Sequence, residues 1–360
     1  MKLLEQINKF VPYFKKLSDV NAFRKILVVS NTGLGDTLLS TPSIVSLRKS
    51  FPEIRITFLI NKKMFPLFEG FEFIDDFVLY SSGFLSQLKI ISEIRSREID
   101  TIFLFHSNGP EDIFFSVLGG ARNILKTTDN VNHKFLKIFL NSANIEYKHN
   151  IEKKLDLVKV FNPSIISKKM LIPHHFYKKN GFIIKNQNQN QNQNYKYLGI
   201  QMGSQDAYKM WPLENFIKLA NRLQSTLVKI KFVLLGATRA EQLISYNFER
   251  AIEDKESVIN LCGKSKINEL PILINDLDLL LTNDTGAMHL AIALQVKTVS
   301  LFGPTDSKIY GPYQDYNFHK VIQVDGSFVN IVPKKQRGSD GMALISIDQV
   351  FDTTCEVLNS

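Results

Sequence analysis

The sequence predicts an α/β protein built from two doubly wound domains, and three observations support this. Short apolar strands alternate with helical segments along most of the chain, a pattern typical of parallel sheets covered by helices. The chain has 360 residues, more than a single hydrophobic core usually supports. An Asn/Gln tract at residues 185–194 lies near the middle, where a two-domain protein would have its linker.

The first half of the chain contains four predicted strands, at residues 24–30, 55–60, 76–80 and 100–105. Each is rich in Ile, Val, Leu or Phe, as buried strands are. One helix is expected from the glycine-containing turn after the first strand through about residue 49, with Pro42 near its start. A second helix is expected at residues 87–97, and residues 110–160 are expected to be mostly helical.

The second half repeats this alternation. Its predicted strands lie at residues 197–202, 230–236, 258–262, 277–282 and 298–302. Its predicted helices lie at residues 213–223, 239–252 and 267–275, with a last helix at 347–358. The repeat of the pattern supports a second doubly wound domain rather than an extension of the first.

These elements give the expected boundaries of the domains. They are an amphipathic extension at 1–23, a first Rossmann-like domain at 24–180, a linker or insertion at 181–195, a second Rossmann-like domain at 196–340, and a closing helix at 341–360 that packs back toward the first domain. Ligands of such sheets bind beyond the carboxyl ends of the strands. We therefore expect a central cleft between the domains, with hinge closure.

Composition restricts the possible partners. The net charge of +9 favours anionic partners, but no aromatic-basic motif indicates nucleic acid. Two cysteines, Cys262 and Cys355, predict neither a disulfide framework nor a cysteine zinc site, and suit a reducing cytoplasm. No apolar run reaches the roughly 18 residues of a membrane span. Residues 1–20 are mildly amphipathic, which fits either a helix on an anionic membrane surface or one packed on its own domain.

The turn after the first strand contains Gly33, Gly35, Asp36 and Thr37. Residue 38 is Leu, so the third glycine of a dinucleotide-binding motif is missing, and no Walker lysine follows. The two glycines allow a ligand to approach the backbone. Asp36 at a helix start can act as a general base or only as a helix cap.

Two loops of the second half carry further candidates. One contains Ser204, Gln205 and Lys209; a hydroxyl and an ammonium group suit an anion such as phosphate, although Lys209 could equally be a solvated lysine. The other contains Thr238 and Glu241. These two side chains could bind ribose hydroxyls, or Glu241 could simply face the positive end of a helix dipole.

The turn at residues 283–286 joins a buried strand to a short helix. It contains Asp284, Thr285 and Gly286, and His289 follows one helical turn later on the adjacent face. Free backbone N–H groups and the positive end of the helix dipole meet in such a turn, which favours phosphate binding. Capping of the helix by Asp284 and Thr285 is the alternative.

Taken together, these motifs resemble glycosyltransferase family 9, the heptosyltransferases of lipopolysaccharide core synthesis. The resemblance spans roughly residues 24–358 and depends on several segments that share the family's order and spacing. They are GLGDTLLSTPSIVSLRKSFP at 33–52, K-x-WP at 209–212, LLGA at 234–237, NDTGAMHLA at 283–291 and LFGPT at 301–305.

The resemblance implies a GT-B fold, with an amino-terminal acceptor domain and a carboxyl-terminal domain for the nucleotide-sugar donor. It also implies inverting transfer of heptose from an ADP-activated donor to the lipid A-core acceptor, without a required metal or another cofactor. Such an enzyme would act in the cytoplasm, in peripheral contact with the anionic inner face of the cytoplasmic membrane.

The resemblance further implies residue roles. Asp36 would be the base, in an acceptor-side loop with Gly33, Gly35 and Thr37, and Lys209 would neutralise the diphosphate leaving group. The remaining implied donor contacts are Ser204, Gln205, Asp284, Thr285, Gly286 and His289. Thr238 stands where some members have an acidic residue near the ribose, and Glu241 could substitute for it.

Three alternatives remain open from the sequence. A glycosyltransferase could use another nucleotide sugar, because donor specificity depends on few contacts. A sugar-nucleotide epimerase of the GT-B fold would need acid and base groups around one sugar and no acceptor. A non-catalytic binding protein could retain the fold, although the joint presence of Asp36, Lys209 and Asp284 argues against lost activity.

Overall fold

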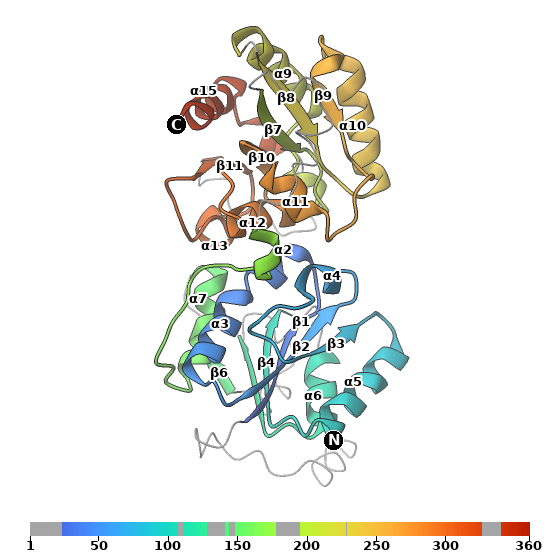
Figure 1. The fold of residues 1–360 in the computed structure, drawn as a ribbon, viewed down its shortest axis with the longest axis vertical. Coiled ribbons are helices and arrows are strands. Elements are labelled where there is room, and N and C mark those ends of the chain that lie inside the picture. Colours follow the sequence, from blue (N-terminus) through green and yellow to red (C-terminus); the bar gives the residue numbers. More distant parts are fainter. Residues whose placement is uncertain are drawn as a thin grey trace. The chain divides into compact units, whose positions relative to one another are not determined.

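The computed structural model describes residues 24–106, 111–127, 141–143, 148–177, 195–227, 229–325 and 340–360. The chain divides into two units, Met1–Pro173 and His174–Ser360. Each unit contains one sheet of six strands with helices packed on it (Figure 1). The predictions for residues 1–23 and for the Asn/Gln tract lie outside the described residues.

The first sheet has the strand order β3-β2-β1-β4-β5-β6, and all of its neighbouring strands are parallel. The strands are β1 Lys25–Ser30, β2 Arg55–Asn61, β3 Asp76–Tyr80, β4 Thr101–His106, β5 Asn123–Thr127 and β6 Asn141–Ala143. The chain reverses its direction of travel across the sheet between β1 and β4. In doubly wound sheets this switch point is where ligands bind.

The helices of this unit are α2 Leu34–Leu38, α3 Thr41–Ser50, α4 Phe65–Phe68, α5 Phe84–Ser96, α6 Glu111–Gly119 and α7 Asn150–Lys159. The single helix expected after β1 is two helices, because a new helix begins after Ser40 with Pro42 in its first turn. The strands β5 and β6 were missed in a region expected to be mostly helical. At five and three residues they are too short to show a period, although Ile124 and Leu125 are fully buried.

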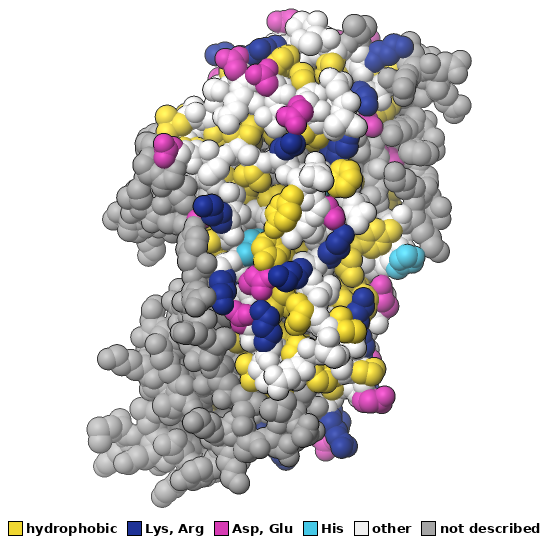
Figure 2. All heavy atoms as spheres, turned by 90° about the vertical axis from the view of Figure 1, so that its left-hand side faces the viewer, with side chains coloured by type: hydrophobic (Ala, Val, Ile, Leu, Met, Phe, Trp, Pro, Cys, Tyr) yellow, Lys and Arg dark blue, Asp and Glu magenta, His cyan; other side chains and the backbone are white. Residues whose placement is uncertain are grey.

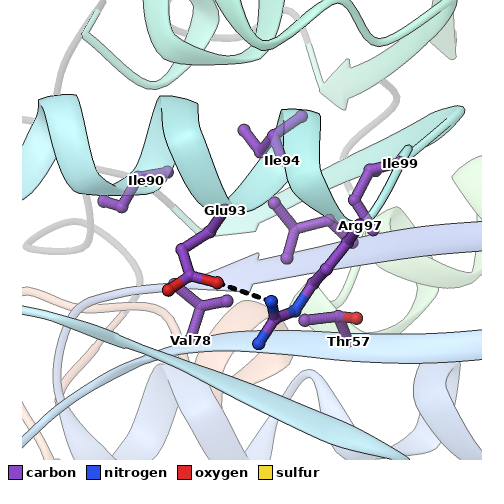
Figure 3. Close-up of a pocket in the computed structure, with 8 residues that line it drawn as sticks. Thr57, Val78, Ile90, Glu93, Ile94, Arg97 and Ile99 are labelled. Atoms are coloured by element: carbon purple, nitrogen blue, oxygen red, sulfur yellow. Dashed lines mark hydrogen bonds and ion pairs between the residues drawn. The ribbon is translucent and has the colours of Figure 1, made fainter.

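A narrow hollow lies between α5 and the first sheet (Figure 3). It has no room for a water molecule. Its lining residues are Leu27, Thr57, Val78, Ile90, Glu93, Ile94, Arg97 and Ile99. Apart from Thr57 and the Glu93–Arg97 ion pair these are apolar side chains of the hydrophobic core, so the hollow is a packing gap and not a ligand site.

The second sheet has the order β12-β11-β10-β7-β8-β9, again with parallel neighbours. Its strands are β7 Lys196–Gln201, β8 Ile230–Leu234, β9 Val258–Asn260, β10 Leu279–Asn283, β11 Thr298–Phe302 and β12 His319–Gln323. The switch point lies between β7 and β10, so this unit repeats the topology of the first. Of these strands, only β12 was not predicted.

Helices and short 3₁₀ turns connect these strands. They are η3 His174–Tyr177, η4 Ala207–Lys209, α9 Leu213–Thr226, α10 Arg239–Ala251, η5 Lys255–Ser257, α11 Leu270–Asn275, α12 Gly286–Ala293, α13 Ser307–Tyr310, α14 Asp340–Ala343 and α15 Ile347–Asn359. Among the described residues, no helix is both long and apolar enough to cross a membrane.

Two expected boundaries differ from the structure. The first unit ends at Pro173 rather than at residue 180, because η3 belongs to the second unit: Asn275 Nδ2 donates to the Phe176 carbonyl at 2.7 Å. The helix α15 was expected to pack toward the first domain. Its apolar face instead joins the core of the second unit, where Val350 and Leu358 are buried against α9 and the sheet.

Candidate functional site

Asp36 lies on α2, directly beyond the carboxyl end of β1 at the switch point of the first sheet. Thr32 Oγ1 donates a hydrogen bond to Asp36 Oδ2 at 3.0 Å, and His106 Nε2 lies 3.3 Å from the same oxygen. The Asp36 side chain is 29% exposed. Both contacts that the described residues make with this carboxylate use Oδ2, and neither uses Oδ1.

His106 is the last residue of β4. Burial lowers the pKa of its imidazole, although the neighbouring Asp36 carboxylate acts in the opposite direction. A neutral imidazole near pH 7 donates through one ring nitrogen only. The 3.3 Å contact between His106 Nε2 and Asp36 Oδ2 places the imidazole beside the carboxylate.

Lys154, on α7, is a second basic group near Asp36. Its side chain is buried, and burial lowers its pKa to about 8, while the Asp36 carboxylate raises it. Such an ammonium group is costly to bury but stabilises an adjacent carboxylate. The site thus combines a carboxylate with an imidazole and a buried lysine.

The cost of burying Lys154 gives a testable prediction. A tenfold change in a protonation equilibrium is about 1.4 kcal/mol, so a fall from 10.5 to about 8 corresponds to about 3 kcal/mol. Lys154→Met is expected to raise the free energy of unfolding at pH 7 by up to this amount, measured by urea denaturation. Between pH 8 and 10.5 the unfolded wild type binds more protons than the native state. Wild-type stability therefore rises with pH, and the advantage of the variant shrinks.

The control is Lys153→Met, since Lys153 is only half-buried on the same helix. It is expected to change stability by less than about 0.5 kcal/mol. If Lys154→Met were less stable than the wild type at pH 7, or if its advantage did not change up to pH 10, the ammonium group would not be a destabilising element.

More polar groups lie at the carboxyl edge of the first sheet. Asn31 Nδ2 donates to Oδ1 of the buried Asp112 at 3.2 Å. Burial lowers the pKa of Lys126, while Asp112 and Glu111 oppose this effect. Burial also raises the pKa of Tyr80, with further contributions from the same two carboxylates. The edge around Asp36 is therefore polar and contains both cations and carboxylates.

In the second unit, Asp284 follows β10 and is nearly buried. Lys209 Nζ lies 2.6 Å from Asp284 Oδ2, and Thr305 Oγ1 donates to the same oxygen at 3.0 Å. Two loops of the sequence prediction, together with the turn after β11, thus converge on one carboxylate. The Lys209 side chain is 19% exposed, so its ammonium group can still reach a ligand.

Asn283 and Trp211 hold these loops in place. Asn283 is fully buried; its Nδ2 donates to the Met202 carbonyl at 2.7 Å, and its Oδ1 accepts from the Trp211 backbone N–H at 3.2 Å. The indole Nε1–H of Trp211 donates to the Ile345 carbonyl at 3.0 Å. The chain before α9 is therefore fixed to the end of β10, which sets the position of Lys209.

The helix α12 begins at the same place. Thr285 is its N-cap residue, but the Thr285 side chain does not cap it; Thr285 Oγ1 instead lies 3.2 Å from Thr282 Oγ1. The first N–H groups of α12 therefore remain available to an anion. Gly286 is the first helical residue and has no side chain to obstruct them. His289, further along α12, is buried.

The remaining donor candidates have different surroundings. Ser204 Oγ accepts from the Asp206 backbone N–H at 3.4 Å, and Gln205 is exposed. Thr238 and Glu241 form a capping box at the start of α10. Both carboxylate oxygens of Glu241 are engaged: Oε2 by Thr238 and Oε1 by Gln201 Nε2 at 2.7 Å. The capping box thus accounts for the contacts of Oε2 with Thr238, and Gln201 holds Oε1.

Gly203 explains how Glu241 reaches this position. A Cβ atom at Gly203 would lie 2.3 Å from Glu241 Cγ. A side chain there would displace the carboxylate from the α10 terminus.

The described residues form no metal site, and the face shown in Figure 2 has no basic stripe. Within the described ranges, no group of three His, Cys, Asp or Glu side chains is arranged to hold a metal ion. On the face shown in Figure 2, Lys and Arg side chains are scattered among apolar and acidic ones. A nucleic-acid surface usually has a continuous basic patch or stripe, which this face does not show.

The sequence model of glycosyltransferase family 9 (heptosyltransferase) matches residues 139–324, more than half of the chain. The chain belongs to glycosyltransferase family 9. It is 28% identical over 308 residues to lipooligosaccharide heptosyltransferase 2 of Campylobacter jejuni subsp. jejuni serotype O:2, covering 84% of this chain and 87% of that protein. The sequence interpretation as a glycosyltransferase of this family is confirmed.

Solved structures show the same fold. A family 9 glycosyl transferase from Veillonella parvula DSM 2008 superposes with a TM-score of 0.76 at 22% identity, covering 94% of this chain and 97% of that one. An Escherichia coli ADP-heptose lps heptosyltransferase II superposes with a TM-score of 0.72 at 18% identity, covering 93% and 98%. The prediction of a GT-B fold with two parallel α/β domains is confirmed.

Four residues that lie near Asp36 or Asp284 were not among the predicted site residues. Thr32, His106 and Thr305 each follow or end a strand, so their position at a carboxyl edge was a usable signal. Lys154 gave no such signal, because a lysine in an amphipathic helix normally faces water.

Proposed function

We propose that this family 9 glycosyltransferase transfers a heptose from an ADP-activated donor to the inner core of lipopolysaccharide or lipooligosaccharide. The proposal rests mainly on the arrangement of Lys209, Asp284 and the free N-terminus of α12 at one edge of the second sheet. An ammonium group and free backbone N–H groups at one place suit a diphosphate. The names of the Campylobacter jejuni and Escherichia coli relatives support the heptose and the ADP-activated donor.

The proposed reaction is a single displacement with inversion. The acceptor hydroxyl oxygen attacks the anomeric carbon of the donor, and the bond from that carbon to the diphosphate oxygen breaks. Asp36 Oδ1 receives the hydroxyl proton, while His106 and Thr32 hold Oδ2. The departing ADP carries the electron pair of the broken bond, and Lys209 stabilises its developing charge. One side chain takes up the proton of the acceptor and another stabilises the charge on the departing diphosphate, so the proposed mechanism requires no metal.

Donor contacts beyond this pair are part of the proposal. Ser204 and Gln205 would line the phosphates, and Thr285, Gly286 and His289 would form the wall beside them. Because Glu241 and Thr238 cap α10, we propose that the nucleoside uses backbone groups of this loop rather than the Glu241 carboxylate. Gly33, Gly35 and Thr37 would form the acceptor-side loop, and the enzyme would act at the inner face of the cytoplasmic membrane.

Calorimetric titration of the full chain with ADP, UDP and GDP in EDTA tests the donor. Selective ADP binding without metal is expected, by at least about tenfold. Release of ADP from ADP-heptose on addition of purified core acceptor then tests transfer. Preference for UDP or GDP would overturn the ADP assignment, and binding that needs Mg²⁺ would overturn metal independence.

A further inference from the structure

The first turns of α5 expose large apolar side chains. Phe84 is 72% exposed, Leu85 80% and Leu88 47%. Their neighbours Ile90 and Ile94 are buried in the core of the first unit, so α5 has one apolar face for the core and a second for the outside. Single exposed apolar residues need no explanation, but three within two turns of one helix indicate an interaction surface.

Exposed apolar side chains also occur on α6, which packs beside α5. Phe114 and Leu118 lie four residues apart on that helix and are 44% and 50% exposed. The two helices lie side by side (Figure 1): Arg95 Nε donates to the Leu118 carbonyl at 3.0 Å. We call the exposed side chains of Phe84, Leu85, Leu88, Phe114 and Leu118 the α5–α6 surface.

Basic residues border this surface. Lys89 on α5 is exposed, as are Lys62 and Lys63 in the turn after β2. The Lys62 backbone N–H donates to the Tyr80 carbonyl at 2.9 Å, which places that turn beside the end of β3, three residues before α5 begins. The first acidic residue of α5, Glu93, is paired with Arg97 at 2.5 Å (Figure 3). Glu111 and Asp112 on α6 also act on Tyr80, so this end of α5 carries exposed lysines beside two carboxylates, of which Asp112 is buried.

We infer that the α5–α6 surface docks on an anionic lipid bilayer, with the apolar side chains in the acyl-headgroup boundary and the lysines on the lipid phosphates. Amphipathic surfaces with aromatic and basic residues bind membranes in this way. A second copy of the chain would bring two lysine borders together, and the resulting repulsion argues against a dimer at this surface.

The location relative to Asp36 supports this role. The helix α5 begins after the carboxyl end of β3, and α2 with Asp36 begins after the carboxyl end of β1 in the same sheet. Docking thus turns the edge with the base toward lipid. This step rests on the proposed function, because only an acceptor anchored in a membrane requires it.

Co-sedimentation with vesicles tests the inference directly. The probes are vesicles with about 30% phosphatidylglycerol in phosphatidylethanolamine, and vesicles of phosphatidylcholine alone. The full chain is expected to bind the anionic vesicles, and Phe84→Ser/Leu85→Ser/Leu88→Ser to bind them at least about tenfold more weakly. The charge variant Lys62→Gln/Lys63→Gln/Lys89→Gln is expected to lose the preference for anionic lipid.

The matched control is Leu243→Ser/Tyr246→Ser on α10, where the two side chains are 61% and 52% exposed. It removes comparable exposed apolar groups from the other unit and is expected to bind vesicles like the wild type. Undiminished binding of the α5 variant would overturn the inference. A wild-type dimer that the α5 variant dissociates would overturn it in favour of self-association. ADP titration of each variant keeps these outcomes separate from failure of the proposed function.

Discussion

Asp36→Asn is expected to lower the turnover of sugar transfer by about 10²–10⁴-fold, the range typical of a lost general base. The amide cannot accept the acceptor's proton, but it has the shape of the carboxylate and can keep the contact with Thr32. Binding of ADP is expected to be unchanged, because Asp36 belongs to the first unit and the diphosphate contacts that we propose belong to the second. Turnover is measured as ADP release, and binding by calorimetry.

Two variants of Thr32 control this experiment. Thr32→Ser keeps the hydroxyl that donates to Asp36 Oδ2 at 3.0 Å and is expected to retain activity. Thr32→Val removes only that hydroxyl and is expected to lower turnover about tenfold, because the carboxylate then loses one of the two contacts on Oδ2. Normal turnover by Asp36→Asn would remove this residue from the mechanism.

Much of the fold could be predicted because its strands are buried on both faces. Strands such as β1 and β10 are continuous apolar segments, and each is followed by a polar turn. The edge strands gave weaker signals. Of the five residues of β12 only His319 and Ile322 are buried, and β6 has three residues, so neither forms a recognisable apolar segment.

The roles of the site residues stay predictions, but the place of three of them in the fold could be read from the sequence. Asp36, Lys209 and Asp284 follow predicted strands, and carboxyl ends of parallel strands meet at one edge. Partners could not be predicted in the same way, since they depend on the packing of distant segments: Lys154 is more than 100 residues from Asp36 in the sequence. For Glu241 the sequence allowed two roles; in the structure it takes part in the capping box of α10 and also accepts from Gln201.

Lys209→Met is expected to weaken ADP binding by at least about tenfold and to lower turnover further, because charge on the leaving diphosphate is greatest in the transition state. Two effects act together. The variant loses the ammonium group, and it leaves the nearly buried Asp284 carboxylate without the cation that now lies 2.6 Å away. That carboxylate would then repel a diphosphate at the start of α12.

A double-mutant cycle separates these two effects. Asp284→Asn in the Lys209→Met background removes the repulsion, so ADP binding is expected to recover in part, while turnover stays low without the ammonium group. Lys209→Arg keeps the positive charge on a planar guanidinium group and is expected to bind ADP better than Lys209→Met. Binding by calorimetry and turnover by ADP release are measured for all variants. If Lys209→Met bound ADP as tightly as the wild type, the Lys209–Asp284 pair would be a structural ion pair, and the diphosphate site would have to lie elsewhere in the second unit.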